Sequence, residues 1–296
     1  MKIVVFGGSG FLGRYLVDAL LREKHEVIVY DLKNAQFNHP KCRVIMGDIT
    51  DAAAITDAIK NVDVVYNLAA ISDIDDCIQH PVEAVRLNVL GNTIILNACV
   101  KQKVKRFILA STLYVYSSSG GIYRSTKQAC ESLVEDFNKY YNLDFTILRY
   151  GTPYGPGAGK KNSVYRFLKQ AMEEKKIDYY GTGNELREYI HAHDAAMLSI
   201  KALDEKYRNE RVILSGAQPN KINDFLTMIN EIFGGHLTIN FIDDKERRSD
   251  VHYQMTPYSY NPKIAKKLVC EAYLDLGQGI LDCIESIKTE NEVKVS

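Results

Sequence analysis

The feature that most constrains this chain is the glycine-rich run at residues 7–13, GGSGFLG. It follows an apolar stretch at residues 2–6 and precedes an amphipathic stretch at residues 14–23, an order that predicts strand, turn and helix. Glycines at positions 7, 10 and 13 permit a tight turn, close approach of a ligand and close packing of helix on strand. The free N–H groups that open such a helix attract anions, so we expect a dinucleotide phosphate here.

An acidic residue follows the second apolar run. Residues 26–30 lead into Asp31, eighteen positions after Gly13, near the roughly 20-residue offset at which an acid meets the adenosine ribose of a dinucleotide. A carboxylate accepts hydrogen bonds from both ribose hydroxyls and repels a 2′-phosphate, so Asp31 favours NAD over NADP. A glycine run alone also suits ordinary turns, and Asp31 supplies the context that favours the cofactor.

Composition argues against several kinds of partner. Lys+Arg and Asp+Glu each number 37, so no basic field is expected to attract nucleic acid or anionic lipid. The six cysteines are scattered with no C-x-x-C pair, which predicts neither a metal site nor a disulfide framework. No leader-like segment opens the sequence and no apolar run approaches roughly 18 residues, so we expect a cytoplasmic protein without membrane contact.

Strand-like and helix-like segments alternate through the first half of the chain. Strands are expected at residues 42–46, 63–66, 106–110 and 144–148, and helices at 52–59, 75–101 and 128–141, with Pro81 tolerated near the start of the long helix. This alternation predicts an α/β fold with a Rossmann-type, doubly wound parallel sheet.

After Tyr150 the pattern becomes irregular, because glycine and proline crowd residues 151–159. We expect an NAD-binding domain at residues 1–160, with later returns to it near 187–216. Residues 161–296 are expected to form mainly a smaller, mixed α/β substrate lobe. Its expected helices lie at 164–175, 222–233 and 276–288, and its expected strands at 177–180 and 211–214.

Two segments at the ends of expected strands are candidates for the adenosine half of the cofactor. Asp48 follows the third strand, at the edge where ligands bind in open α/β sheets, and could hold the adenine amino group. Capping of the helix at 52–59 explains Asp48 equally well, although Thr50 and Asp51 can also cap. The small residues after the fourth strand, at 68–70, would let the cofactor pass close to the backbone.

The fifth strand and the helix after it carry candidate catalytic groups. The strand ends in Ser111-Thr112, while Tyr123 and Lys127, four positions apart, share a helix face. The lysine and a cationic nicotinamide would together lower the tyrosine pKa from about 10 toward neutrality, which asks for about 4 kcal/mol. The tyrosinate would then take a proton from a substrate hydroxyl held by Thr112. A surface pair is the alternative, because the chain holds 19 tyrosines; the position after the fifth strand favours catalysis.

Together these motifs resemble the extended short-chain dehydrogenase/reductase family, specifically its NAD-dependent nucleotide-sugar epimerases and dehydratases. The resemblance covers nearly the whole chain. The matching segments are 7–13, Asp31, 47–49, 67–70, Asn88-Val89 with Gly91, Ser111-Thr112, Tyr123 with Lys127, Arg149-Tyr150 through 154–156, and 187–191.

The resemblance implies particular contacts. Expected cofactor contacts are Gly7, Gly10, Phe11, Leu12, Gly13, Asp31, Asp48, Ile49, Leu68, Ala69, Ala70, Tyr123, Lys127 and Tyr150; expected substrate contacts are Thr112, Thr152, Arg187 and Arg248. The two arginines would clamp the sugar nucleotide's pyrophosphate, because guanidinium groups bind phosphate in a bidentate manner; for Arg247-Arg248 a solvated charge run is the alternative. No metal is expected. The resemblance also implies a role in polysaccharide biosynthesis and a homodimer formed by the helices at 75–101 and 128–141.

Several positions depart from the family pattern. Relatives that remove water carry Asp-Glu directly after the catalytic threonine, whereas this chain has Leu113-Tyr114, which supply no acid and base at neutral pH. The 3,5-epimerase/reductases place a cysteine near this point; here only Cys77 and Cys130 could approach from elsewhere. Thr152 stands where many relatives have Asn. The connection from residue 112 to 123 is shorter than usual, which indicates a more open site.

The sequence therefore predicts NAD-dependent oxidation at C4 of a nucleotide-diphosphate sugar, by a 4-epimerase or a 4-dehydrogenase/reductase. One alternative is a dehydrogenase that releases the 4-keto sugar and uses a second small oxidant such as a 2-oxo acid. Another is a non-catalytic NAD sensor, which the complete set of Thr112, Tyr123 and Lys127 disfavours. The base, the sugar and the direction of reaction are left open.

Overall fold

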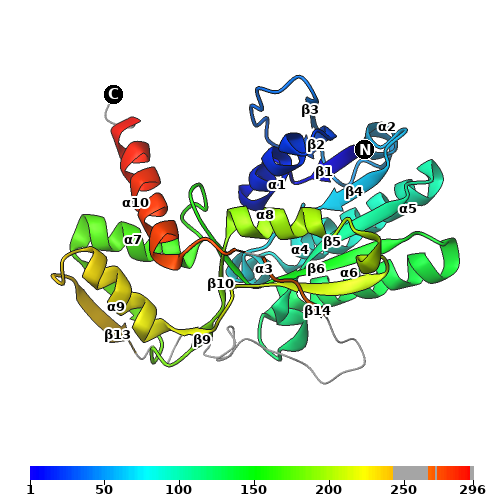
Figure 1. Ribbon diagram of the computed structural model, residues 1–296. Coiled ribbons are helices and arrows are strands. Elements are labelled where there is room, and N and C mark those ends of the chain that lie inside the picture. Colours follow the sequence, from blue (N-terminus) through cyan, green and yellow to red (C-terminus); the bar gives the residue numbers. More distant parts are fainter. Residues whose placement is uncertain (243–265, 271, 294–296) are drawn as a thin grey trace.

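A parallel sheet forms the larger part of the molecule (Figure 1). The computed structural model describes residues 1–242, 266–270 and 272–293. The strands of this sheet are β1 (Lys2–Phe6), β2 (Glu26–Asp31), β3 (Cys42–Met46), β4 (Val64–Asn67), β5 (Arg106–Thr112), β6 (Phe145–Tyr150), β11 (Glu210–Leu214) and β14 (Lys266–Lys267). Their order is β3-β2-β1-β4-β5-β6-β11-β14, and every neighbouring pair is parallel. The predicted doubly wound sheet is confirmed.

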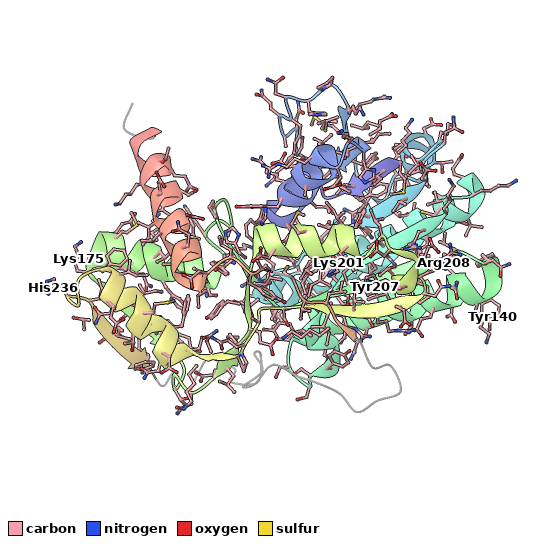
Figure 2. All side chains as sticks on the ribbon, viewed as in Figure 1. Tyr140, Lys175, Lys201, Tyr207, Arg208 and His236 are labelled. Carbon is pink, nitrogen blue, oxygen red and sulfur yellow. The ribbon has the colours of Figure 1, made fainter. Side chains whose placement is uncertain are left out.

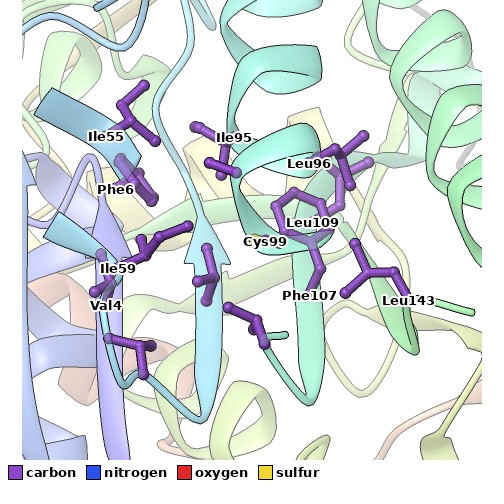
Figure 3. Packing of buried hydrophobic residues seen from close by; sticks show 14 of the residues in the cluster. Val4, Phe6, Ile55, Ile59, Ile95, Leu96, Cys99, Phe107, Leu109 and Leu143 are labelled. Atoms are coloured by element: carbon purple, nitrogen blue, oxygen red, sulfur yellow. The ribbon is translucent and has the colours of Figure 1, made fainter. Parts of the chain in front are cut away.

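Helices cover both faces of this sheet. On one face lie α2 (Ala52–Ala58), α5 (Asn92–Gln102) and α6 (Gly121–Tyr141), and on the other lie α1 (Phe11–Arg22) and α8 (Ala192–Lys201). Alternate residues of β1 serve the two cores, since Val4 packs toward α2 and α5 and Val5 toward α1. Figure 3 shows the first core, in which Ile55 and Ile95 lie over the sheet near Phe6.

A third hydrophobic cluster lies beside the sheet. It is built by α7 (Ser163–Glu174), α9 (Ile222–Ile232), α10 (Leu276–Val293) and β8 (Lys176–Tyr180), which pairs in parallel with β13 (Thr238–Ile242). Lys175 and His236 lie in this part, while Tyr207 and Arg208 lie beside the large sheet (Figure 2). Between them the chain returns to the large sheet with α8 and β11, within the interval 187–216. No helix of the described residues is both long enough and apolar enough to cross a membrane.

Short elements connect the two parts. Two small pairs are β7 (Thr152–Tyr154) with β10 (Tyr189–His191), which are parallel, and β9 (Leu186–Arg187) with β12 (Asn220–Lys221), which are antiparallel. The 3-10 turns are η2 (Leu113–Tyr116) and η3 (Glu205–Tyr207). The glycine-rich loop after β7 is tied to α1, because the Tyr15 hydroxyl donates to the Pro156 carbonyl at 3.0 Å.

The single helix predicted at residues 75–101 is wrong. The chain forms α3 (Ile74–Gln79), α4 (Pro81–Ala84), the π-helical segment η1 (Val85–Gly91) and then α5. His80 leaves the helical region (φ −126°, ψ 61°) because the ring of Pro81 clashes with a helical residue before it, and Pro81 instead begins the next helix. The helix predicted at residues 128–141 extends back to residue 121, so that it includes Tyr123 and Lys127 as their shared helix face requires, and α8 is a helix that was not predicted.

Candidate active site

The glycine turn lies at the point where the strand order reverses, between β1 and its neighbours β2 and β4. Gly7 has φ +76°, and a Cβ on it would lie 2.7 Å from the Ala69 nitrogen; a Cβ on Gly13 would lie 2.2 Å from the Gly7 carbonyl oxygen. Gly10 caps α1 without a side-chain hydrogen bond, and the first turn holds no acid. The N–H groups of this turn, beside the partly exposed Phe11 and Leu12, therefore fit a pyrophosphate.

Asp31 lies at the carboxyl end of β2 and is anchored against the glycine turn. Its Oδ2 accepts the Ser9 N–H and its Oδ1 accepts the Lys33 N–H, both at 3.0 Å. A carboxylate offers about four lone-pair sites, so half of its accepting capacity stays available. The partly exposed side chain fits a pair of ribose hydroxyls.

The structure separates the two interpretations of Asp48. Asp51, not Asp48, caps α2, because its Oδ1 accepts the N–H groups of Ala53 and Ala54. Asp48 accepts the N–H and the hydroxyl of Thr50 at 2.8 and 2.9 Å, with Arg86 3.6 Å from its other oxygen. The Thr50 N–H, aided by Arg86, holds the pKa of Asp48 below its usual value.

At Ile49 and at residues 68–70, the predicted cofactor contacts would be made more by the backbone than by long side chains. Ile49 is buried, and its side chain packs against Gly91 and within the first core. Residues 68–70 follow β4, beside the glycine turn, and are partly exposed. A ligand would meet their small side chains and backbone.

The three predicted catalytic residues come together at the end of β5. Thr112 is its last residue, and Tyr123, in the first turn of α6, lies close enough for the Thr112 side chain to lower the pKa of its hydroxyl. The Lys127 Nζ lies 5.9 Å from the centroid of the Tyr123 ring and donates to the Ala110 carbonyl at 2.8 Å. Strand end and helix start thus hold a hydroxyl pair and a cation in one place.

Burial dominates the electrostatics of this cluster. It raises the pKa of Tyr123 well above its ordinary value, while the Thr112 side chain acts in the opposite direction. Burial also lowers the pKa of Lys127, which is only 4% exposed. Lys127 alone therefore does not bring Tyr123 toward neutrality, and ionisation of the tyrosine requires further positive charge at the site.

A buried ion pair that sequence reasoning missed supports the cluster. Glu131 accepts from the Ser111 hydroxyl at 2.6 Å and from the Arg149 Nε at 2.9 Å, and Arg149 also contacts the Tyr116 hydroxyl. The pair links α6 to the ends of β5 and β6. Its one sequence signal is the repeated four-residue spacing from Tyr123 through Lys127 to Glu131.

Three residues at or near the predicted site make packing contacts or hydrogen bonds within the protein. Tyr150 pairs in register with Thr112, but its hydroxyl bonds the Ser199 hydroxyl at 2.6 Å in the core under α8. Leu113 is 1% exposed, and the Tyr114 ring packs edge-on to Tyr123 with centroids 6.5 Å apart.

The two cysteines considered as acids are also structural. The thiols of Cys77 and Cys130 donate to the carbonyls of Ile71 and Asn88, at 3.4 and 3.0 Å. Burial raises the pKa of each thiol to about 11. Neither group is an acid or base at neutral pH.

The substrate-side predictions are described only in part. Thr152 lies on β7, partly exposed, and Arg187 on β9 donates to the Leu186 carbonyl at 2.9 Å. Arg248, with Arg247, lies outside the described residues. The short connection after η2 is held by Arg124, which donates to the carbonyls of residues 117 and 118.

Comparison with known proteins identifies relatives over most of the chain. Residues 3–215 match the model of a protein family described as "NAD dependent epimerase/dehydratase family". A UDP-glucuronate 4-epimerase of Thermodesulfobacterium geofontis is 25% identical, over 96% of this chain and 98% of its own length. A UDP-N-acetyl-alpha-D-glucosaminuronate decarboxylase of Bacillus cytotoxicus is 27% identical, over 78% and 80%. The crystal structure of the UDP-glucuronic acid 4-epimerase of Bacillus cereus, in complex with UDP-glucuronic acid and NAD, superposes with a TM-score of 0.81 at 24% identity, over 98% of this chain and 100% of the other.

Proposed function

This chain belongs to the NAD-dependent epimerase/dehydratase family of enzymes, and from that premise we propose that it oxidises C4 of a nucleotide-activated sugar with Tyr123 as general base. The observation that carries the proposal is the meeting of Tyr123, Lys127 and Thr112 at the end of β5. Relatives that act on UDP-sugars support the same substrate class.

The glycine turn and the strand ends beside it would hold the cofactor. The N–H groups of α1 take the pyrophosphate, Asp31 takes the ribose hydroxyls and Asp48 takes the adenine amino group. Lys127 bonds the nicotinamide ribose, as the resemblance implies. When bound, NAD supplies the hydride acceptor and a positive charge at the site.

The proton step falls to this chain's own residues. The Tyr123 oxygen takes the proton of the C4 hydroxyl, and the Thr112 hydroxyl bonds the same substrate oxygen. Lys127, fixed by its bond to the Ala110 carbonyl, stabilises the tyrosinate. Thr152, Arg187 and Arg248 bind the diphosphate end of the substrate and so fix which carbon meets Tyr123.

Water elimination is not expected. Leu113 is buried in place of the acid that dehydratases carry, and the Tyr114 ring packs against Tyr123. Leu113 and Tyr114 therefore supply no acid and base pair directly after Thr112 to remove a hydroxyl. The keto sugar either takes the hydride back on its opposite face, which gives the 4-epimer, or leaves as a ketone.

A 4-keto-sugar dehydrogenase remains the second candidate, and the short connection after η2 favours it. Only residues 117–120, held by Arg124, separate η2 from α6, and we infer that so short a connection admits a second small substrate such as a 2-oxo acid.

Incubation with a panel of UDP-, GDP-, CDP- and dTDP-sugars separates these outcomes. Reactions run with and without a 2-oxo acid, in deuterated solvent, with mass analysis of the products. A 4-epimer without net redox supports the epimerase, and a stable keto sugar with reduced cofactor supports the dehydrogenase. Loss of water would overturn the interpretation of Leu113 and Tyr114, and inertness toward every sugar nucleotide would overturn the proposal.

A further inference from the structure

The π-helical segment η1 fixes the loop that follows β4. π-helical turns are rare and concentrate at functional sites. Asn88, 3% exposed, lies within η1, and its Oδ1 accepts the Ile71 N–H at 2.8 Å while its Nδ2 donates to the Ile71 carbonyl at 3.0 Å. Ile71 directly follows the residues 68–70 that line the proposed cofactor site, so η1 sets the position of that lining.

The same residue is joined to α6 at two points. The Asn88 Nδ2 donates to the Thr126 hydroxyl at 3.1 Å, and that hydroxyl donates to the Tyr123 carbonyl at 2.8 Å. One turn further along α6, the Cys130 thiol donates to the backbone carbonyl of Asn88 at 3.0 Å. Cys130 is 1% exposed, so water does not reach this contact.

We propose that Cys130 is a positioning residue for the catalytic pair: its thiol holds the Asn88 carbonyl of η1 against α6 and thereby fixes Tyr123 and Lys127 relative to the loop at 68–71. The role rests on the proposed function of Tyr123 and Lys127. A buried carbonyl that loses its donor is costly, so without the thiol η1 would shift to find another partner. The shift would pass through Asn88 and Thr126 to Tyr123.

The thiol acts through geometry and not through charge. The groups that face the pair are Thr112 from β5, Cys77 from α3, and Cys130 and Glu131 from α6. Both thiols remain neutral at pH 6–9, because their pKa values are about 11. The charge of Glu131 is balanced by Arg149, whose Nη2 lies 2.5 Å from the Glu131 Oε2. A change in Tyr123 ionisation after substitution of Cys130 would therefore report a displaced tyrosine, since the Thr112 side chain that lowers its pKa would then lie farther from its hydroxyl.

The test compares Cys130→Ala with Cys130→Ser, which keeps a donor, and with Cys99→Ala as a matched control. Cys99 is a buried cysteine of α5 in the same core and belongs to none of these contacts to η1. Each variant, saturated with NAD, is titrated by phenolate absorbance, and the curve of its own Tyr123→Phe derivative is subtracted. Hydrogen exchange of the amides at 121–128 is measured in parallel.

In Cys130→Ala we expect the Tyr123 pKa to rise by about half a unit to one unit, a roughly three- to tenfold loss of phenolate, with faster exchange at 121–128. Cys130→Ser and Cys99→Ala should leave both unchanged. Equal effects in the two alanine variants, or a serine variant that behaves like alanine, would overturn the proposal.

If Cys130→Ala does not fold, Thr126→Ala against Thr126→Ser tests the other arm of the same link, with the same two readouts. A rise in the Tyr123 pKa that occurs in Thr126→Ala but not in Thr126→Ser supports the proposal. Equal titration curves for the two variants overturn it. The titration needs NAD but no sugar, so failure of the sugar-nucleotide panel leaves this result readable.

Discussion

The Tyr123 hydroxyl is the group on which the proposed chemistry depends. It lies beside Thr112 on the strand side and on the helix face that carries Lys127. Because burial raises its pKa in the protein alone, we expect Tyr123 to act as a base only after positive charge is added. The proposed proton abstraction would then be confined to the complex with cofactor.

Tyr123→Phe should lower turnover by about 10²- to 10⁴-fold, since it deletes only the proton acceptor. Binding of NAD and of the sugar nucleotide should persist because the ring and its edge-on contact with Tyr114 remain. Rates from product analysis and affinities from calorimetry check both points. Lys127→Ala is the contrasting variant and should weaken NAD binding as well as turnover; joint loss of binding and turnover in Tyr123→Phe would indicate a structural role instead.

Cofactor choice should follow from Asp31. We expect NADP to bind about tenfold or more weakly than NAD, roughly 1.4 kcal/mol, because a 2′-phosphate would face this carboxylate. Fluorescence titration with both cofactors measures the ratio. Asp31→Asn removes the repulsion between the carboxylate and the 2′-phosphate, so it should reduce the ratio of the two affinities. Tighter binding of NADP than of NAD by the unaltered protein would contradict the assignment of NAD as cofactor.

Among helices and strands, the parts that follow one hydrophobic period were predictable from sequence. The first strand, glycine turn and first helix are examples, because a continuous apolar run at residues 3–6 is followed by a glycine run and then by a period-3.6 pattern. The π-helical η1 was not predictable, since its apolar residues continue the helical pattern on either side and the extra residue in the turn leaves no periodic mark.

Within the candidate site, the sequence did not reveal contacts between residues that lie far apart in the chain. Tyr123 and Lys127 were visible because both lie on one helix, four residues apart. Glu131 and Arg149 meet from different elements, as do Cys130 and Asn88, and only packing of α6 on the sheet and on η1 brings each pair together. Tyr150 shows the converse, since a residue at the expected strand end turns its hydroxyl into the opposite core.

The N-terminus of α2 offers a test of the two neighbouring aspartates. Asp51→Ala removes two hydrogen bonds to backbone N–H groups and should lower the free energy of unfolding by about 1 kcal/mol, with NAD affinity unchanged. Asp48→Ala should weaken NAD binding. Urea denaturation and NAD titration of both variants check this, and the reverse pattern would return the capping role to Asp48.

For the molecule as a whole we expect a homodimer. On the first of the two helices predicted to form the interface, Leu96 is fully buried and Ile94 and Val100 pack against the first cluster, so these three residues belong to the core. Exposed apolar side chains instead lie on α4 and η1, where Val82 is 81% and Leu90 50% exposed. Tyr140, 65% exposed, adds to them at the end of α6 (Figure 2).

Sedimentation at micromolar concentration should therefore give a dimer that the double variant Val82→Lys, Leu90→Lys converts to monomer. Leu281→Lys is the control, because this exposed leucine lies on α10, among the third-cluster helices. A monomer in the unaltered protein would end the idea, and dissociation by the control alone would place the interface elsewhere.

The two-residue strand β14 and the helix α10 also bear on how the protein is made. Leu268, just after β14, is buried in the core under α1 and α8, and Ile280 of α10 is buried in the third cluster. A ribosome releases these residues only after residues 1–267, so neither core can close before they emerge. The nascent chain would display two open apolar surfaces until translation passes them, which makes it a natural client for chaperones and sensitive to premature termination.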